Sequence, residues 1–286
     1  MKKPLLAALL AVILAGAGSA PAAAASRDWT APHEKAKAKV KAVDFAGTVA
    51  LSNCSGSVVR TPGSAPQDPA LVLSNGHCLE GGMPDAGEVV VDKPSTRSFS
   101  LLNSAGSKVA TLRATKISYA TMKDTDISLY ELNTSYAQIE SSSGIRALEL
   151  ASGRPVQGSA IKVVSGYWKR IYSCNIDGFA HRLREGDWTW KDSVRYTPAC
   201  NTVGGTSGAP VVDTVGGKVV AVNNTGNEDG ERCTVNNPCE VDEGGNVTVR
   251  ERINYAQQTY GITKCIGIGN KVDLGLPGCE LPKPQD

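Results

Sequence analysis

The sequence predicts an all-β protein, a barrel or a sandwich, with one helix near its C-terminal end. From Phe45 onward, short runs rich in apolar and β-branched residues alternate with stretches of Gly, Ser, Asn and Pro. Many short strands at close spacing, with turn residues between them and almost no helical periodicity, are typical of this fold class. The exception is Arg250–Tyr260, a polar segment with Ala and Gln, which we expect to form the late helix.

The expected strands fall into two series separated by Ser141–Gly144, the best candidate for a linker. The first series comprises Thr48–Leu51, Gly56–Arg60, Ala70–Ser74, Glu88–Asp92, Ser98–Leu102, Val109–Ile117 and Ser128–Leu132. The second series comprises Ala160–Gly166, Ile171–Ile176, Ser193–Tyr196, Pro210–Asp213, Lys218–Asn223 and Asn246–Arg250. The length of 286 residues allows one large domain or two of ordinary size, and no internal repeat is evident.

The charge balance argues against a surface that binds nucleic acid or an anionic membrane. The chain carries 30 Lys and Arg against 28 Asp and Glu, and Lys2 and Lys3 are the only charged residues among the first 25. Without that segment, 28 basic side chains balance 28 acidic ones. Binding to polyanions needs a clear basic excess or stripe.

The first 25 residues are expected to be a signal peptide. The basic start Met1–Lys3 precedes the apolar run Pro4–Ala15, and the small residues of Gly16–Ala25 offer Ala-x-Ala cleavage sites. The apolar run is shorter than the ~20 residues of a membrane span. We therefore expect a secreted, extracellular protein without a membrane anchor. Residues 26–43 are interpreted as a basic arm or pro-segment.

Eight cysteines follow the signal segment, and an even number in an oxidising compartment predicts four disulfides. Pairing of sequence neighbours is the simplest of the possible connectivities: Cys54 with Cys78, Cys174 with Cys200, Cys233 with Cys239, and Cys265 with Cys279. Zinc is disfavoured because the sequence has no CxxC pair and only three histidines. We expect neither a metal nor a cofactor.

Three local motifs carry chemistry. An apolar strand runs into the turn Ser74-Asn75-Gly76-His77-Cys78 and presents a histidine; Asp126 opens an alternating strand; Ser207 lies in Gly204-Gly205-Thr206-Ser207-Gly208-Ala209-Pro210. Acyl transfer by a serine needs a neutral imidazole as base, held in one tautomer by a buried acid. It also needs two backbone N–H groups that face the oxyanion, and the small residues before the serine favour Gly205 and Ser207 as donors.

Each motif alone has an ordinary structural explanation, but the three together favour a catalytic function. His181 is interpreted as a surface residue because no strand-and-turn pattern adjoins it, and Asp124 lies before the alternating pattern begins. A lipase or esterase is excluded because its order requires a histidine after the serine, and none follows Ser207. The acids of Asn227–Glu243 lack the spacing of a calcium loop.

The three motifs identify the chain as similar to the trypsin/chymotrypsin-like serine proteases, from about Phe45 to Tyr260. Asn75-Gly76-His77-Cys78 resembles the family's histidine motif, Asp126-Ile127-Ser128-Leu129 its Asp-Ile-Ala-Leu, and Gly205-Thr206-Ser207-Gly208-Ala209-Pro210 its serine motif. The serine motif is nearest to that of secreted bacterial glutamyl endopeptidases. The resemblance implies that Cys54 pairs with Cys78, and that His77, Asp126 and Ser207 are catalytic.

The same resemblance implies two six-stranded antiparallel barrels with the site between them. We then expect a first barrel over residues 44–140, a second over 141–262 and a disulfide-bearing tail over 263–286. Protein or peptide substrates and a monomeric state follow from the same likeness.

Departures from the family pattern affect activation and specificity. Thr206 replaces the acid that pairs with a newly cut N-terminus in the animal enzymes, so that mode of activation is not expected. Asn201 stands where trypsin-like enzymes carry an acid, and Asn223 where glutamyl endopeptidases carry a histidine. The resemblance therefore implies a polar, uncharged specificity pocket with Asn201 and Asn223.

Two functions from different classes stay open at this point. A secreted serine endopeptidase is favoured because all three catalytic positions keep reactive residues. An inactive trypsin-like homologue that acts as a secreted binding protein is the alternative.

Overall fold

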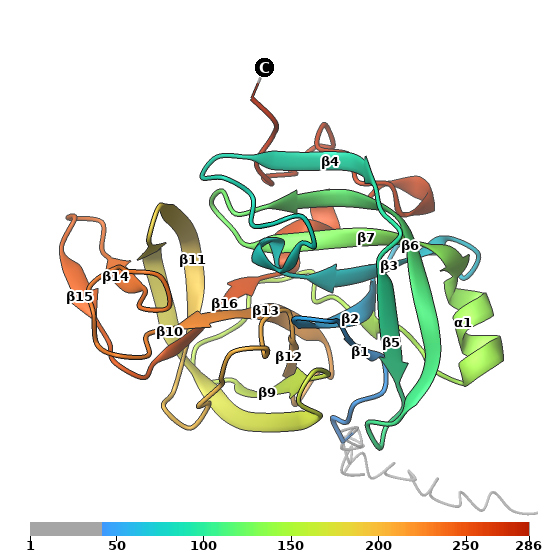
Figure 1. Ribbon diagram of the computed structural model, residues 1–286, viewed down its shortest axis with the longest axis horizontal. Coiled ribbons are helices and arrows are strands. Elements are labelled where there is room, and N and C mark those ends of the chain that lie inside the picture. The colour runs from blue at the N-terminus through green and yellow to red at the C-terminus, as the bar shows by residue number, and fades with distance from the viewer. Residues whose placement is uncertain (1–41, 286) are drawn as a thin grey trace, which may run out of the picture. The chain divides into compact units, whose positions relative to one another are not determined.

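The computed structural model describes residues 42–285, which form two antiparallel β-barrels (Figure 1). The predicted signal peptide, and all but the last two residues of the predicted basic arm, lie outside the described residues. Within residues 42–285, no helix has the length and apolar character that crossing a bilayer requires.

The first barrel closes through six strands in the order β1-β5-β6-β7-β3-β2, with β2 pairing back to β1. Its strands are β1 (Thr48–Ala50), β2 (Ser55–Arg60), β3 (Pro69–Ser74), β5 (Ser98–Leu102), β6 (Lys108–Thr121) and β7 (Ile127–Ser135). Strand β4 (Val89–Pro94) pairs with β6, and the short β8 (Leu148–Glu149) adds to β2. This sheet therefore extends beyond residue 140, where we expected the first barrel to end.

The second barrel closes in the order β11-β16-β13-β12-β9-β10, with β10 pairing back to β11. Its strands are β9 (Ala160–Ser165), β10 (Arg170–Glu185), β11 (Trp188–Tyr196), β12 (Pro210–Asp213), β13 (Val219–Gly226) and β16 (Asn254–Gln258). Strands β14 (Cys239–Val241) and β15 (Val247–Val249) continue outward from β10. The expectation of two six-stranded antiparallel barrels is confirmed.

The late helix expected over Arg250–Tyr260 is wrong, because that segment contains strand β16. β16 pairs with β13 on one side and β11 on the other, so it completes the second barrel. The α-helix of the described chain is α1 (Tyr136–Ser143), which overlaps the predicted linker. A capping box starts it: Gln138 N–H donates to the Ser135 hydroxyl, and the Gln138 side chain accepts from Ser135 N–H. Short 3₁₀ turns complete the helical content at Gly76–Cys78, Tyr260–Lys264 and Ile268–Asn270.

Separate apolar clusters fill each barrel, and a third joins the two barrels. Val59, Leu71 and Leu73 from the first sheet pack in this third cluster with Val164 and Val212 from the second. All five side chains are buried, so apolar packing helps to hold the two barrels together.

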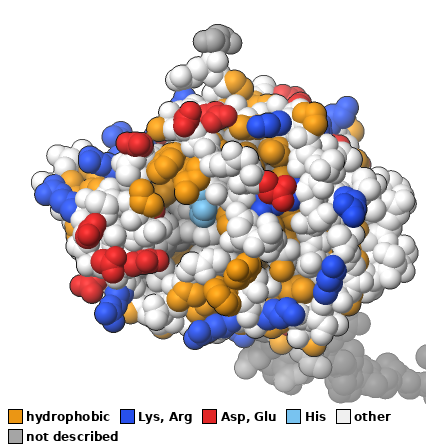
Figure 2. All heavy atoms as spheres, in the orientation of Figure 1, with side chains coloured by type: hydrophobic (Ala, Val, Ile, Leu, Met, Phe, Trp, Pro, Cys, Tyr) orange, Lys and Arg blue, Asp and Glu red, His pale blue; other side chains and the backbone are white. Residues whose placement is uncertain are grey.

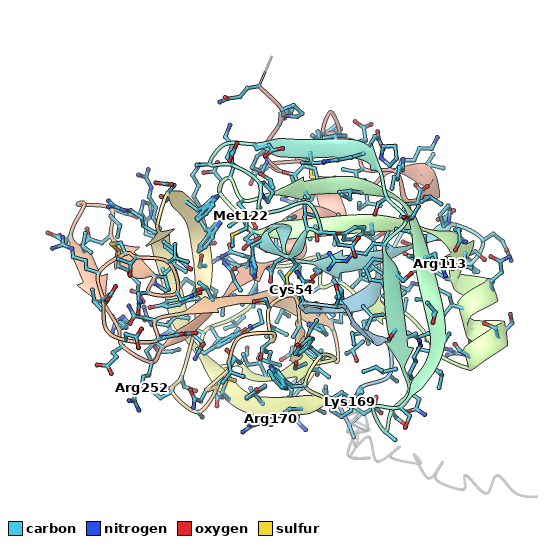
Figure 3. The ribbon with its side chains drawn as sticks, viewed as in Figure 1. Cys54, Arg113, Met122, Lys169, Arg170 and Arg252 are labelled. Carbon is cyan, nitrogen blue, oxygen red and sulfur yellow. A yellow bond between two sulfur atoms is a disulfide. The ribbon has the colours of Figure 1, made fainter. Side chains whose placement is uncertain are left out.

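The four disulfides pair each cysteine with its neighbour in the sequence, which is the connectivity that we favoured as simplest. Cys54–Cys78 joins the start of β2 to the turn after β3, near the centre of the molecule (Figure 3). Closing a loop of that length stabilises the fold by roughly 3 kcal/mol in the chain-entropy model.

The C-terminal tail packs on the first barrel after the chain has left the second. Asn270 is buried, and its amide donates to the Pro69 carbonyl and the Tyr136 hydroxyl while it accepts from Ser64. Tyr119 donates to the Pro282 carbonyl at 2.9 Å. These contacts hold the C-terminal tail against the first barrel.

Candidate active site

His77 lies in the 3₁₀ turn that follows β3, and its neighbours fix that turn. A Cβ at position 76 would collide with the carbonyl of Thr121, so only glycine fits there. On the other side of the histidine, Cys78 is held by its disulfide, and the buried Arg97 guanidinium donates to its carbonyl at 2.6 Å. The imidazole is therefore presented by a rigid backbone.

Asp126 is fully buried at the start of β7 and faces the histidine turn. Its Oδ2 lies 2.6 Å from Nδ1 of His77, and its Oδ1 accepts from the backbone N–H of His77 at 3.1 Å. The Asn75 amide donates to the backbone carbonyl of Asp126 at 2.7 Å. These contacts leave Nε2 as the ring nitrogen that can act as a base.

Ser207 lies on the turn before β12, and this turn is bound to the first barrel. The Ser207 carbonyl accepts from the N–H of Ser55 in β2 at 2.7 Å. A Cβ at the next residue, Gly208, would collide with the Ser55 carbonyl and the Ser74 hydroxyl, and Gly208 has φ +80°. The glycine after the serine is thus required by close packing between the two barrels.

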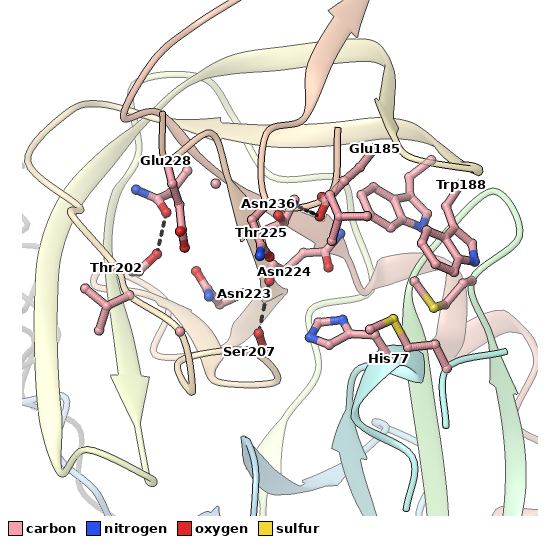
Figure 4. A pocket seen from close by; sticks show the side chains of 18 residues that line it. His77, Glu185, Trp188, Thr202, Ser207, Asn223, Asn224, Thr225, Glu228 and Asn236 are labelled. Atoms are coloured by element: carbon pink, nitrogen blue, oxygen red, sulfur yellow. Dashed lines mark hydrogen bonds between the residues drawn. The ribbon is translucent and has the colours of Figure 1, made fainter. Parts of the chain in front are cut away.

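Ser207 and His77 line one pocket between the barrels, and their side chains face each other across it (Figure 4). In this structure the Ser207 hydroxyl donates to the carbonyl of Asn224 at 3.2 Å. A hydroxyl turns about its χ1 bond, so it can exchange this acceptor for the imidazole. Figure 2 shows a histidine in the hollow of this face, with apolar side chains on either side and acidic side chains at one end.

The backbone before Ser207 forms a turn with two unused donors. Thr206 N–H donates to the Val203 carbonyl at 3.0 Å, and Gly205 has φ +83°, which a type II turn requires at its third residue. The carbonyl of Gly204 accepts from the indole N–H of Trp168 at 2.7 Å. Among residues 42–285, the N–H groups of Gly205 and Ser207 have no hydrogen-bond acceptor.

Charges around His77 change its basicity. Burial alone would lower the pKa of His77, but the charge of Asp126 and the hydrogen bond to it, with a smaller effect of Glu185, raise the pKa above 6.5. Glu185 ends β10 at the edge of the pocket, and its Oε1 accepts from the N–H of Asn236 at 2.8 Å. Burial raises the pKa of Glu185 as well.

The structure places one of the two expected pocket residues in the pocket. Asn223 lines it, whereas the Asn201 side chain is exposed and does not, so that prediction is wrong. Successive residues of this extended stretch face opposite sides, and the next side chain, Thr202, points inward instead. Sequence reasoning also missed Asn254 and Glu185, which barrel closure brings to the pocket.

Asp124 and His181, which we set aside, do not line the pocket, whereas Glu228 of the acidic loop does. The half-exposed Asp124 pairs with Lys191 at 2.8 Å, and His181 lies 4.0 Å from Glu243 at the surface. The loop over Asn227–Glu243 is held by the Cys233–Cys239 disulfide and by Asn227, whose amide donates to two backbone carbonyls.

Comparison with known proteins decides the family. Residues 54–222 match the model of the trypsin-like peptidase domain, which is more than half of the chain. The chain belongs to the trypsin-like peptidases. The resemblance inferred from the three motifs is therefore confirmed, and the chain is a trypsin-like serine protease. The likeness to glutamyl endopeptidases stays a prediction.

Several solved protease structures are similar to this one. The active form of the Rv3671c protease from M. tuberculosis has 13% identity and a TM-score of 0.49, over 85% of each chain. The thermostable serine protease AL20 from an extremophilic microorganism has 17% identity and a TM-score of 0.43, over 75% of this chain and 91% of its own. The MamO protease domain from Magnetospirillum magneticum has 12% identity and a TM-score of 0.45, over 75% and 92%. The search of curated protein sequences found no match.

Proposed function

We propose that this trypsin-like protease is a secreted serine endopeptidase that cleaves peptide bonds through Ser207, His77 and Asp126. The observation that carries the proposal is the 2.6 Å contact between Asp126 and Nδ1 of His77, in the same pocket as Ser207. A buried acid on one ring nitrogen leaves the other as the base for a serine hydroxyl.

The catalytic cycle follows from these positions. His77 takes the proton of Ser207 as its oxygen attacks the peptide carbonyl, and Asp126 stabilises the imidazolium. The free N–H groups of Gly205 and Ser207 bind the oxyanion. His77 then protonates the leaving amine, and an acyl-enzyme remains on Ser207. Water, activated by the same imidazole, releases the acyl group and restores the serine.

Secretion and endopeptidase action rest on further features. Four disulfides and a predicted signal peptide support an oxidising, extracellular location. The hollow that holds the histidine is open to the surface in Figure 2, so a substrate need not present a chain end to reach it.

Digestion of an unfolded protein tests the proposal. We expect mass spectrometry of the products to find cleavage at internal peptide bonds, and the Ser207→Ala variant to give none. If the wild type releases only terminal residues, it is an exopeptidase. If the folded wild type cleaves nothing, the alternative of a binding homologue replaces the proposal.

The raised pKa of His77 predicts the pH dependence of cleavage. The base must be neutral, so kcat/KM should fall as the pH drops through a midpoint above 6.5. Glu185→Gln removes a negative charge that favours the imidazolium, so the midpoint should move to lower pH. The pH profile of kcat/KM for both proteins measures this, and a wild-type midpoint well below 6.5 would contradict the assignment of the base.

Trp168 is expected to position the oxyanion donors. Its indole N–H holds the Gly204 carbonyl, so the Gly205 N–H on the same planar trans peptide points away from the indole. Trp168→Phe removes this bond and keeps the ring, and we expect kcat to fall about tenfold with a smaller change in KM, on the scale of one hydrogen bond. Tyr167→Phe, in the same loop, is the control and should retain kcat. An unchanged kcat in Trp168→Phe would show that the turn before Ser207 keeps its conformation without the hydrogen bond from Trp168.

A further inference from the structure

Two neutral polar side chains, Thr202 and Asn254, line the pocket that holds Ser207. The Thr202 hydroxyl donates to Oδ1 of Asn254 at 2.8 Å, and the Asn254 amide donates to the carbonyl of Cys200 at 3.0 Å. Both side chains are buried and line the pocket. Both side chains are therefore hydrogen-bonded and uncharged.

Four residues that line the pocket have buried side-chain polar atoms without partners within residues 42–285: Glu185, Trp190, Asn223 and Asn224. Of these four, the two asparagines are joined most directly to the nucleophile, since the acceptor of the Ser207 hydroxyl is the Asn224 carbonyl. Asn223 is 2% exposed and Asn224 is 3% exposed. Within the described part of the chain, Oδ1 of Asn223 and both amide atoms of Asn224 have no hydrogen-bond partner. Buried polar groups without partners lower stability, so such groups in a pocket mark atoms that a ligand can satisfy. The carbonyl of the same Asn224 holds the Ser207 hydroxyl, so these groups lie beside the nucleophile.

The groups that line the pocket do not match an ionised substrate side chain. Its lining includes two acids, Glu185 and Glu228, and no Lys or Arg of residues 42–285. A substrate carboxylate would therefore meet negative charge and no cation. A Lys or Arg side chain beside Asn223 and Asn224 can only donate, so it would leave the amide N–H of Asn224 without an acceptor. An unpaired buried charge is strongly disfavoured.

We infer that this pocket takes a carboxamide side chain, Gln or Asn, of the substrate residue whose carbonyl Ser207 attacks. A primary amide carries two N–H donors and one carbonyl acceptor. Its donors match Oδ1 of Asn223 and Oδ1 of Asn224, and its carbonyl matches the amide N–H of Asn224. An apolar side chain leaves these groups unpaired, which is the situation in which a polar site discriminates most strongly. The inference rests on the proposed peptidase activity of the same site.

Matched fluorogenic peptides test the inference when they differ only at the residue before the cleaved bond: Gln, Asn, Glu, Lys or Leu. We expect kcat/KM for the better of Gln and Asn to exceed that for each of the other three by roughly tenfold or more, on the scale of one to two hydrogen bonds. Comparable or higher values for Glu, Lys or Leu overturn the inference.

Variants assign the preference to the pocket. Asn223→Leu should lower the ratio of kcat/KM between the better amide peptide and the Leu peptide by about tenfold. Asn201→Leu makes the same change at the exposed neighbour and should leave that ratio at its wild-type value. Reaction of Ser207 with a fluorophosphonate checks that each variant is assembled, and Asn223→Ser gives a second reading if the leucine variant does not react.

The same probe separates failure of the inference from failure of the proposed function. If the wild type reacts with the fluorophosphonate but prefers another residue, or cleaves none of the peptides, the reactive serine is supported and the amide pocket is contradicted. If the folded wild type does not react, both the proposed peptidase activity and the amide pocket are contradicted.

Discussion

Ser207→Ala is expected to lower kcat by about 10⁶-fold, the scale on which removing a triad serine acts. Alanine leaves no oxygen to attack the carbonyl, so the acyl-enzyme cannot form, although the oxyanion donors and the pocket remain. The hydroxyl makes one hydrogen bond, to the Asn224 carbonyl, so its loss should change the free energy of unfolding little. Initial rates on a cleaved peptide, measured beside the thermal unfolding of both proteins, give the comparison.

The pair His77→Ala and Ser207→Ala sharpens this result. Because the two residues act as one unit, the double variant should be about as slow as either single variant. Independent, additive losses would show that Ser207 and His77 do not share one proton transfer. Peptidase activity near the wild-type rate in Ser207→Ala would remove Ser207 from the mechanism.

Asp126→Asn is expected to lower kcat by about 10⁴-fold at neutral pH, the loss that follows when a triad histidine is held in the wrong tautomer. The carboxylate contacts Nδ1 of His77 at 2.6 Å and can only accept there, so the proton stays on Nδ1 and Nε2 is free. An asparagine can donate to Nδ1 instead, which places the proton on Nε2 and removes the base.

Asp124→Asn is the matched control, two residues earlier in the chain. That side chain is half-exposed and pairs with Lys191 at the surface, so the same substitution should leave kcat within about twofold. Equal losses in the two variants would indicate a general effect of this loop instead of a role for Asp126 on the imidazole.

The barrel strands could largely be predicted from the sequence, because turn residues delimit them and β-branched residues fill them. The segment around Asn254 was mistaken for a helix because its polar, Ala- and Gln-bearing sequence has no strand pattern of its own. Its structure is set by pairing with β11 and β13 on both sides, which overrides local propensity. The helix α1 did have a local signal, Ser135 followed three residues later by Gln138.

The candidate site, too, could be predicted from the sequence only in part. His77, Asp126 and Ser207 lie in short motifs whose glycines and flanking strands are visible in the sequence. The pocket is assembled from separate segments, and Asn254 and Glu185 reach it only through closure of the second barrel. Asn201 was misplaced by one residue, because sequence spacing does not tell which of two adjacent side chains faces inward.

Intact-mass analysis of the purified, disulfide-bonded protein before and after reaction with a fluorophosphonate, followed by peptide mapping, tests most directly whether Ser207 is the activated nucleophile. We expect one adduct, on Ser207, and its absence in Ser207→Ala, because only an assembled serine, base and oxyanion site activates that hydroxyl. A folded protein with all four disulfides and no adduct, or with the adduct on another residue, would contradict this role of Ser207.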